Sequence, residues 1–164
     1  MSDWKNDRVR SAIEGRNPTV FAELGAAFAV LGDTQFLPGY ALALTKKPGV
    51  DRLTDLPRAE RVRFLADVDL IATAVESVCA ARDPQYRRTN VEILGNTHHF
   101  LHAHLWPRYE WEPADIVGVP VWAYPAERWN DPETLLGSRH EELRSALAGE
   151  VARLRNAPDF RFDV

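Results

Sequence analysis

Four of the five histidines in this sequence lie within seven consecutive positions, and they are its clearest candidates for chemistry. The four are His98, His99, His102 and His104. In an extended strand, successive side chains alternate between the two faces, so His102 and His104 are expected on one face, about 6–7 Å apart along the strand. Trp106 would share that face, and the sequence therefore predicts two imidazoles side by side.

Three interpretations of this histidine pair are open from the residues alone. The pair could bind a metal ion, but such a site needs a third and usually a fourth ligand. The nearest acidic residues are Glu92 and Glu110, and no cysteine is close. The pair could also be purely structural. In the third interpretation it is catalytic: one neutral imidazole attacks phosphorus, while a second, cationic imidazole stabilises charge or protonates the leaving group.

The elements that must position the pair follow from hydrophobic periodicity and turn residues. Helices are predicted over 2–14 and 57–82, with a last helical region that begins at 131, restarts at 138 and stops at 156–158. Strands are predicted over 19–24, 26–31, 39–45, 90–94 and 101–106. The first three strands indicate an antiparallel meander. With one long crossover helix and terminal helices, this order predicts an α+β fold built on an antiparallel sheet.

Apolar side chains mark the faces of these elements that should be buried. In the histidine strand, Leu101, Ala103 and Leu105 alternate with the imidazoles and should face the core. The long helix carries the stripe Phe64, Leu65, Val68, Ile71, Ala72, Val75, Val78 and Cys79. The last helix carries Leu143, Leu147, Val151 and Leu154. Cys79 is thus expected to be a small buried apolar residue.

Composition sets limits on the class of protein. Twenty basic and twenty-four acidic residues give a net charge of −4, which argues against a nucleic-acid partner. The single cysteine excludes an internal disulfide and a multi-cysteine zinc site. No apolar run approaches the roughly 20 residues of a membrane span, and the polar start lacks a signal-peptide core, so a cytoplasmic protein with no membrane partner is expected. The 164 residues favour one domain, with a core at about 19–122 and a C-terminal helical extension over 123–164.

The segment that holds the histidines resembles the active-site strand of the histidine triad (HIT) family. The motif of that family is His-φ-His-φ-His-φ-φ, where φ is an apolar residue, often followed by Pro-Arg. Phe100, His102 and His104 occupy the three motif positions here, and Pro107 and Arg108 follow as in the family. The departure is Phe100, which stands where the family usually has His or Gln.

Two further elements carry the same resemblance, which extends from Val20 to Trp122. The stretch 31–44, Leu-Gly-Asp-Thr-Gln-Phe-Leu-Pro-Gly-Tyr-Ala-Leu-Ala-Leu, resembles the Asp-x-x-Pro-Gly-x-Leu-φ-φ hairpin of the family. The stretch 118–122, Gly-Val-Pro-Val-Trp, is similar to a Pro-φ-Trp element of a bacterial branch. The order and spacing of the three elements make the resemblance specific.

The resemblance assigns roles to individual positions. It implies that His102 is the nucleophile and that His104 contacts the phosphate and the departing group. Asp33 would hold ribose hydroxyls, and Asn90 would be the loop asparagine. Gly95, Asn96 and Thr97 would bind phosphate oxygens through backbone N–H groups and a hydroxyl. Phe100 would line or border the pocket.

Each of these assignments has a simpler alternative. Asp33 could be an ordinary turn residue, since Asp is favoured in turns. Thr97 could bond only within its own loop, and Asn90 could cap the end of a strand. His98 and His99 match no catalytic position and are interpreted as solvated or structural.

The activity implied by the resemblance is that of a nucleotide hydrolase. It would cleave at the α-phosphate of a nucleoside 5′-phosphate derivative, such as a diadenosine polyphosphate or a nucleoside phosphoramidate, through a nucleotidyl-histidine. No cofactor or metal is needed at the nucleophile, although Mg²⁺ could accompany a polyphosphate. A homodimer is expected, because many members are dimers and aromatic residues are enriched at interfaces. The alternative is a non-enzymatic, regulatory nucleotide-binding protein, because Phe100 cannot donate or accept a hydrogen bond.

Overall fold

Five antiparallel strands form a single sheet in the order β1-β2-β3-β5-β4. The structure is a computed structural model that describes residues 3–160. The strands are β1 (Val20–Glu23), β2 (Ala27–Leu31), β3 (Ala41–Thr45), β4 (Tyr86–Glu92) and β5 (His102–Tyr109). The α-helices are α1 (Arg8–Ile13), α2 (Arg58–Arg82), α3 (Ala126–Trp129) and α4 (Glu141–Arg155). Short 3₁₀ turns are η1 (Trp4–Asp7), η2 (Leu53–Asp55), η3 (Val121–Ala123), η4 (Ser138–His140) and η5 (Pro158–Phe160). The predicted α+β class and the meander of β1 to β3 are confirmed.

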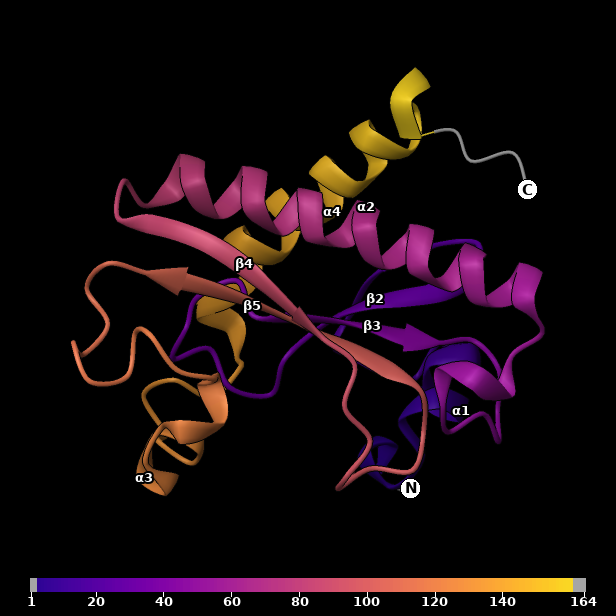
Figure 1. The fold of residues 1–164 in the computed structure, drawn as a ribbon, viewed down its shortest axis with the longest axis horizontal. Helices are drawn as coiled ribbons and strands as arrows, with labels where there is room; N and C mark the ends of the chain where they lie inside the picture. The colour runs from indigo at the N-terminus through magenta and orange to yellow at the C-terminus, as the bar shows by residue number, and fades with distance from the viewer. Residues whose placement is uncertain (1–2, 161–164) are drawn as a thin grey trace.

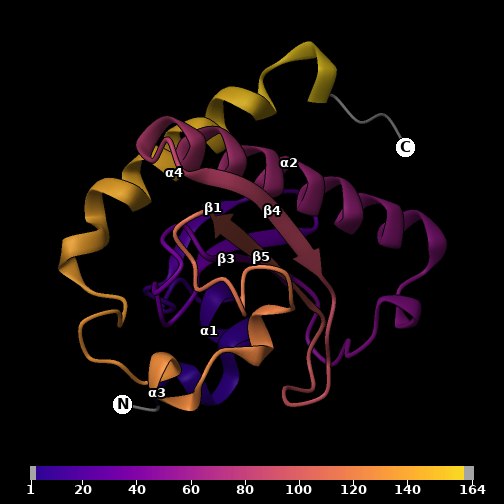
Figure 2. The same ribbon diagram turned by 60° about the vertical axis from the view of Figure 1, so that its left-hand side comes forward.

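The sheet separates two layers of helices. Helices α2 and α4 lie on one side of it, and α1 and α3 lie on the other (Figures 1 and 2). A row of alanines, Ala29, Ala43 and Ala103, runs in register across β2, β3 and β5 and is fully buried in the cluster that includes the α2 side chains. Small side chains in this row let the long helix approach the sheet closely, since interiors are close-packed.

Strand alternation gives the opposite face a different character. Phe28, Val30 and Leu44 form a second cluster with Val9 and Ala12 of α1. This is also the face of β5 on which the histidines lie, because Leu44 is the cross-strand partner of His102. The N-terminal segment is therefore packed next to the candidate site.

Helix α2 confirms most of its predicted stripe, with one error. The side chains of Phe64, Val68, Ile71, Val75, Val78 and Cys79 are buried, whereas Leu65 is 39% exposed. The buried side widens instead toward Leu70 and Ala74. The position of α4 explains the burial of Leu70 and Ala74. Glu150 of α4 is hydrogen-bonded to Ser77, which lies on the same side of α2 as Leu70 and Ala74. The four predicted apolar residues of α4 are all buried.

The hairpin of β4 and β5 is longer than predicted. Strand β4 begins at Tyr86 rather than at 90, and β5 continues through Pro107 to Tyr109. The proline is tolerated because β3 pairs with β5 only as far as Leu105, so at Pro107 the strand has a partner on one side alone.

The chain ends also differ from the prediction. The predicted first helix is the short turn η1 followed by α1, with Asp3 and Asp7 accepting hydrogen bonds at their starts, and the predicted cap Ser2 lies outside the described residues. Asp131 starts no helix: its carboxylate accepts from the Glu133 N–H, as a cap would, but the chain makes only a turn there. The 134–136 segment pairs instead with residues 33–35, beside the candidate site. Within residues 3–160, no helix has the length and apolar character needed to span a bilayer.

Candidate active site

Strand β5 presents the two histidines on the face of the sheet opposite α2. The ring centroids of His102 and His104 are 4.7 Å apart, and both side chains are buried. Their cross-strand partners on β3, Leu44 and Leu42, put an apolar side chain next to each imidazole. Trp106 stacks against His104 at a centroid distance of 5.7 Å. The prediction that these three β5 side chains share one face is confirmed.

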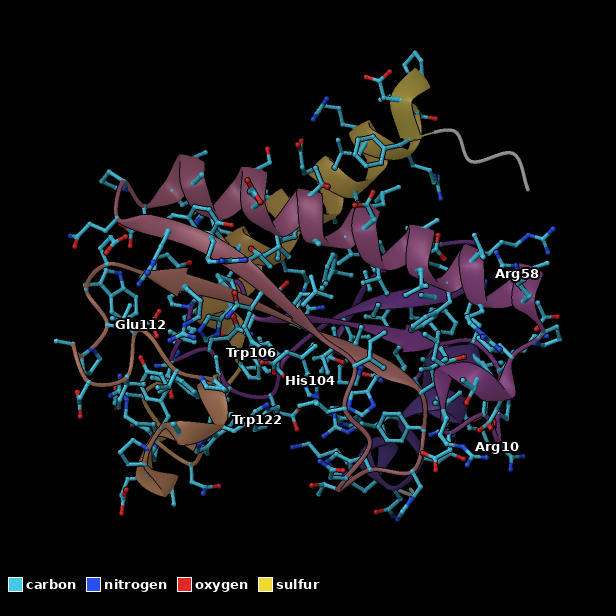
Figure 3. The ribbon with its side chains drawn as sticks, in the orientation of Figure 1. Arg10, Arg58, His104, Trp106, Glu112 and Trp122 are labelled. Atoms are coloured by element: carbon cyan, nitrogen blue, oxygen red, sulfur yellow. The ribbon has the colours of Figure 1, made fainter. Side chains whose placement is uncertain are left out.

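A cavity of about 600 Å³ lies over this face and is lined by both histidines. Two tryptophans from the segment after β5 form one wall of it. Trp122 and Trp129 are stacked, with centroids 5.1 Å apart and an interplanar angle of 2°. Trp122 also meets His104 edge-on at 5.1 Å, below Trp106 (Figure 3). The lining is aromatic on this side, which suits a planar ring of a ligand.

A chain of hydrogen bonds fixes the proton positions on both imidazoles. Nδ1 of His102 is 2.7 Å from the carbonyl oxygen of Phe100, which can only accept, so Nδ1 carries the proton. In the neutral ring, Nε2 of His102 is then an acceptor, and Nε2 of His104, 3.1 Å away, donates to it. Nδ1 of His104 accepts in turn from the Tyr40 hydroxyl at 2.8 Å. One backbone carbonyl therefore sets the direction of the whole chain.

Both imidazoles are held neutral at neutral pH. Burial lowers the pKa of His102, although the hydrogen bond to the Phe100 carbonyl opposes this by favouring the charged ring. Burial also lowers the pKa of His104 to about 3, and the neighbouring His102 and His98 add to the effect. Nε2 of His102 therefore has an unprotonated lone pair, which is what a nucleophile requires.

The loop before β5 supplies some of the predicted phosphate-binding residues. Asn96 and Thr97 line the cavity, and Gly95 precedes them without lining it. Asn90 does not line the cavity. It lies within β4, opposite Trp106, so it is part of a strand rather than a loop.

Two of the ring side chains of this loop, Phe100 and His98, line the cavity, whereas His99 does not. The ring of Phe100 lines the cavity, tilted against His102 at a centroid distance of 4.8 Å. His98 also lines the cavity, 5.7 Å from the Phe100 ring, so it borders the site although its side chain is exposed. His99 is exposed and lies 3.7 Å from the Asp51 carboxylate, away from the cavity lining.

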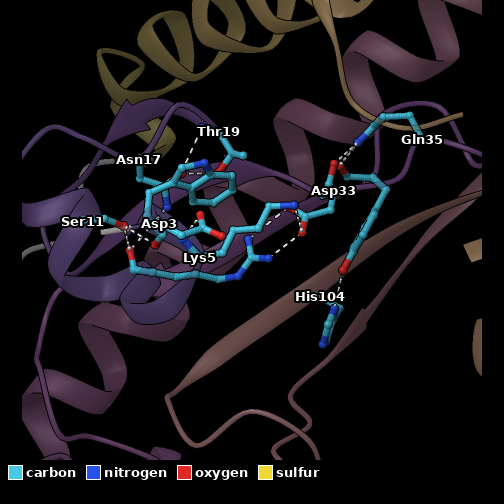
Figure 4. A network of polar contacts seen from close by, with 12 residues as sticks. Asp3, Lys5, Ser11, Asn17, Thr19, Asp33, Gln35 and His104 are labelled. Atoms are coloured by element: carbon cyan, nitrogen blue, oxygen red, sulfur yellow. Dashed lines mark hydrogen bonds and ion pairs between the residues drawn. The ribbon is translucent and has the colours of Figure 1, made fainter. Parts of the chain in front are cut away.

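Asp33 lines the cavity and is paired with two cations from the N-terminal segment. The guanidinium of Arg8 donates to both carboxylate oxygens, at 3.1 and 2.5 Å, and Nζ of Lys5 is 3.6 Å away (Figure 4). Burial raises the pKa of Asp33, but the hydrogen bonds and charges of Arg8 and Lys5 outweigh it, so the pKa lies below its usual range. Asp33 is therefore a carboxylate at neutral pH.

A buried ion pair holds the segment that leads to the tryptophan wall. Nε of Arg108 donates to both carboxylate oxygens of Glu112, at 2.9 and 3.0 Å, and both side chains are almost fully buried. The other guanidinium nitrogens donate to three carbonyl oxygens of the 116–119 segment. Tyr124 donates to Glu112 from beyond that segment. This network fixes the backbone on both sides of Trp122.

Three residues of the site were missed from sequence. Arg8 had no signal, because it is one charged residue on a short helix. Trp129 lies in an irregular, aromatic-rich stretch without periodicity. Tyr40 lies in the Pro-Gly hairpin, where a hydroxyl next to apolar strand residues could have marked it. Within residues 3–160, no group of three histidine, cysteine or carboxylate side chains is arranged to hold a metal ion.

The fold and this site define a class of protein. A model of the HIT domain matches residues 15–111, more than half of the chain, so the chain belongs to the HIT domain family. The resemblance found in the sequence is thus confirmed, and no curated protein matches the chain by sequence.

Solved structures show the same fold. A histidine triad protein from Marinobacter aquaeolei VT8 has a TM-score of 0.66 at 18% identity, over 82% of this chain and 88% of that one. A hypothetical histidine triad nucleotide-binding protein from Sulfolobus tokodaii has a TM-score of 0.64 at 14% identity, over 95% and 99%. A Hit-like protein involved in cell-cycle regulation from Bartonella henselae has a TM-score of 0.64 at 19% identity, over 89% and 96%.

Proposed function

We propose that this chain is a nucleotide-binding hydrolase that cleaves at the α-phosphate of a nucleoside 5′-phosphate derivative. The observation that supports this best is the unprotonated Nε2 of His102 in a cavity large enough for a nucleotide. Its orientation comes from the Phe100 carbonyl, which keeps the proton on the other ring nitrogen. A positioned neutral imidazole is suited to nucleophilic attack on phosphorus.

In the first step, the Nε2–H of His104 turns from His102 to the leaving atom, which frees the lone pair on Nε2 of His102. That nitrogen attacks the α-phosphorus, and the bond from phosphorus to the leaving atom breaks. The adduct makes the His102 ring cationic, and the Phe100 carbonyl stabilises that charge at Nδ1–H. The negative phosphate of a bound substrate favours uptake of a proton from solvent at Nδ1 of His104, and the Tyr40 hydroxyl can then accept from its Nδ1–H. His104 gives its Nε2 proton to the leaving atom and returns to the neutral form.

In the second step, water attacks the nucleotidyl-histidine. His104, neutral after the first step, takes a proton from the water as the oxygen bonds to phosphorus. The bond between phosphorus and Nε2 of His102 breaks, which restores the lone pair on that nitrogen. His104 is now cationic, and as the negatively charged nucleoside monophosphate leaves, its Nδ1 proton returns to solvent. This restores the neutral ring with the proton on Nε2, which is the starting state.

The remaining lining residues fit the parts of a nucleotide. Asn96, Thr97 and the backbone at Gly95 would donate to phosphate oxygens, and the Asp33 carboxylate would accept from the ribose hydroxyls. The wall of Trp122 and Trp129 would stack on a planar ring. Dinucleoside polyphosphates and nucleoside phosphoramidates both meet these requirements. A polyphosphate would bring Mg²⁺ on its own phosphates, and no cofactor is otherwise required.

A non-enzymatic nucleotide-binding protein is the second candidate, and one observation favours it. The phenyl ring of Phe100 lies 4.8 Å from the nucleophile, where a polar side chain could otherwise help to order the site. Such a protein would bind nucleotides in the same cavity and release no product.

The two candidates are separated by one experiment. The purified chain is incubated with a panel of adenylated and guanylated compounds, and released nucleoside monophosphate is quantified together with binding. We expect release by the wild type, its loss in His102→Ala with binding retained, and no change in His99→Ala, a control on the exposed histidine. Near-normal turnover by His102→Ala would sink the mechanism, and binding without any release would favour the regulatory alternative.

We also propose that the chain forms a homodimer. Strand β4 is at one edge of the sheet, so one side of its backbone has no neighbouring strand within residues 3–160. Val91 is 48% exposed on this strand, and Ile93, one residue beyond its end, is also exposed. Trp111 is exposed as well and is hydrogen-bonded to Asp83, which precedes the strand. An unpaired edge with exposed apolar side chains is suited to a second copy. Light scattering should give about twice 18.5 kDa, and a monomer at micromolar concentration would contradict this.

A further inference from the structure

The charges around the cavity are few, and one of them has no role in the function proposed above. Among the cavity-lining side chains of residues 3–160, only Arg8 and Asp33 carry a permanent charge. Both catalytic imidazoles are neutral in the free protein, as their burial requires. A phosphate group that enters the cavity therefore meets one permanent cation, the guanidinium of Arg8.

Arg8 is held in place by buried polar groups. The Asn17 amide donates to the carbonyl oxygen of Arg8 at 3.3 Å. The Ser11 hydroxyl is shared between the carbonyl oxygens of Arg8 and Trp4, at 3.1 and 3.0 Å, and the side chains of Ser11 and Asn17 are almost fully buried. Asn17 is itself fixed, because its side-chain oxygen accepts from the N–H and the hydroxyl of Thr19 (Figure 4). This anchors the first turn of α1 to the start of β1. The Arg8 backbone is thereby fixed at the rim of the cavity.

The side chain of Arg8 is oriented by Asp33 and still has donors to offer. Two of its five N–H groups donate to the two carboxylate oxygens. The guanidinium charge is close enough to the nucleophile to contribute to the lowered pKa of His102, although burial is the main cause. Carboxylates accept up to about four hydrogen bonds, so Asp33 can hold Arg8 and still accept from other groups.

We propose that Arg8 is a substrate-binding residue that donates to the phosphate group next to His102, with Asp33 as the residue that orients it. This rests on the proposed nucleotide site and adds a residue from outside the HIT-like segment of the sequence. A guanidinium matches the geometry of phosphate oxygens and binds them through charge-assisted hydrogen bonds.

The test compares ligands with and without the phosphate. Binding of AMP and adenosine, and of GMP and guanosine, is measured by calorimetry for the wild type, Arg8→Gln, Arg8→Lys and Arg10→Gln. Arg10 is the matched control, because it lies on the same helix, is exposed and pairs with Glu14 away from the cavity. Near-ultraviolet circular dichroism verifies that each variant is folded.

Arg8→Gln should weaken binding of the monophosphate by about tenfold or more, because a charge-assisted hydrogen bond is lost. Binding of the nucleoside should change by less than about twofold, Arg8→Lys should be intermediate and Arg10→Gln should match the wild type. Equal losses for nucleotide and nucleoside, or no loss at all, would overturn the role of Arg8 and leave the nucleotide site standing. If the wild type binds neither the nucleotides nor the nucleosides, the proposed function fails. Binding of inorganic phosphate then tests Arg8 separately. Equal phosphate binding by the wild type and Arg8→Gln overturns the inference.

Discussion

His104 should make the stability of this protein depend on pH, and the substitution His104→Gln should remove the part of that dependence that His104 contributes. Burial lowers the pKa of His104 from 6.5 to about 3. Below about pH 6.5 the unfolded chain binds a proton on this imidazole, whereas the folded protein does not until about pH 3. The unfolded state thus holds more protons in this range, so the free energy of unfolding falls as the pH falls.

The size of the effect follows from the same pKa difference. One proton taken up on unfolding changes the free energy of unfolding by about 1.4 kcal/mol per pH unit. Between pH 7.5 and 4.5, His104 alone should therefore cost about 2–3 kcal/mol. His102, whose pKa is also lowered by burial, adds a further loss that remains in the His104→Gln variant.

Urea unfolding monitored by tryptophan fluorescence, at pH 7.5, 6.5, 5.5 and 4.5, measures this dependence. The slope of the wild type should exceed that of His104→Gln by up to about 1.4 kcal/mol per pH unit. His99→Gln makes the same chemical change at a side chain that is 84% exposed and outside the cavity, so it controls for the substitution itself. Identical slopes for the wild type and His104→Gln would refute the argument, because His104 would then titrate in the folded protein as it does in water.

Three further substitutions test other parts of the site. Tyr40→Phe leaves Nδ1 of His104 buried without its donor, so urea unfolding should show a loss of about 1–3 kcal/mol; an unchanged stability would contradict the hydrogen-bond chain. Arg108→Met leaves the Glu112 carboxylate buried without its cation and should cost about 3–5 kcal/mol in the same assay; a loss below about 1 kcal/mol would refute the role of the pair. Phe100→Gln should raise the hydrolysis rate on a substrate that the wild type cleaves, because a positioned polar group orders the site, whereas Phe100→Ala should not; a slower Phe100→Gln in steady-state kinetics would show that the phenyl ring is adapted to this site.

Local periodicity was enough to predict the long helix and the histidine face. The α2 stripe from Phe64 to Val78 and the alternation of Leu101, Ala103 and Leu105 with the histidines follow from the geometry of a single helix or strand. Both are properties of neighbouring residues. They could therefore be predicted without knowledge of what lies against them.

Strand and helix limits were predicted less well where a neighbour decides them. Strand β5 continues through Pro107 because β3 ends its pairing at Leu105, and the exposure of Leu65 depends on where α4 packs on α2. Propensity alone would end a strand at a proline and would bury a leucine. The packed partner outweighs propensity in both places.

The sequence by itself determined which side chains could do the chemistry and that His102 and His104 share a face. Only the tertiary structure decided their protonation and their charges. The hydrogen bond from Tyr40 joins residues 64 positions apart, and the pair of Arg8 and Asp33 joins residues 25 positions apart. Burial, which lowers the pKa of both histidines, depends on the whole fold. Such contacts leave no periodic trace in the sequence, because they depend on how distant segments pack and not on the order of residues within one segment.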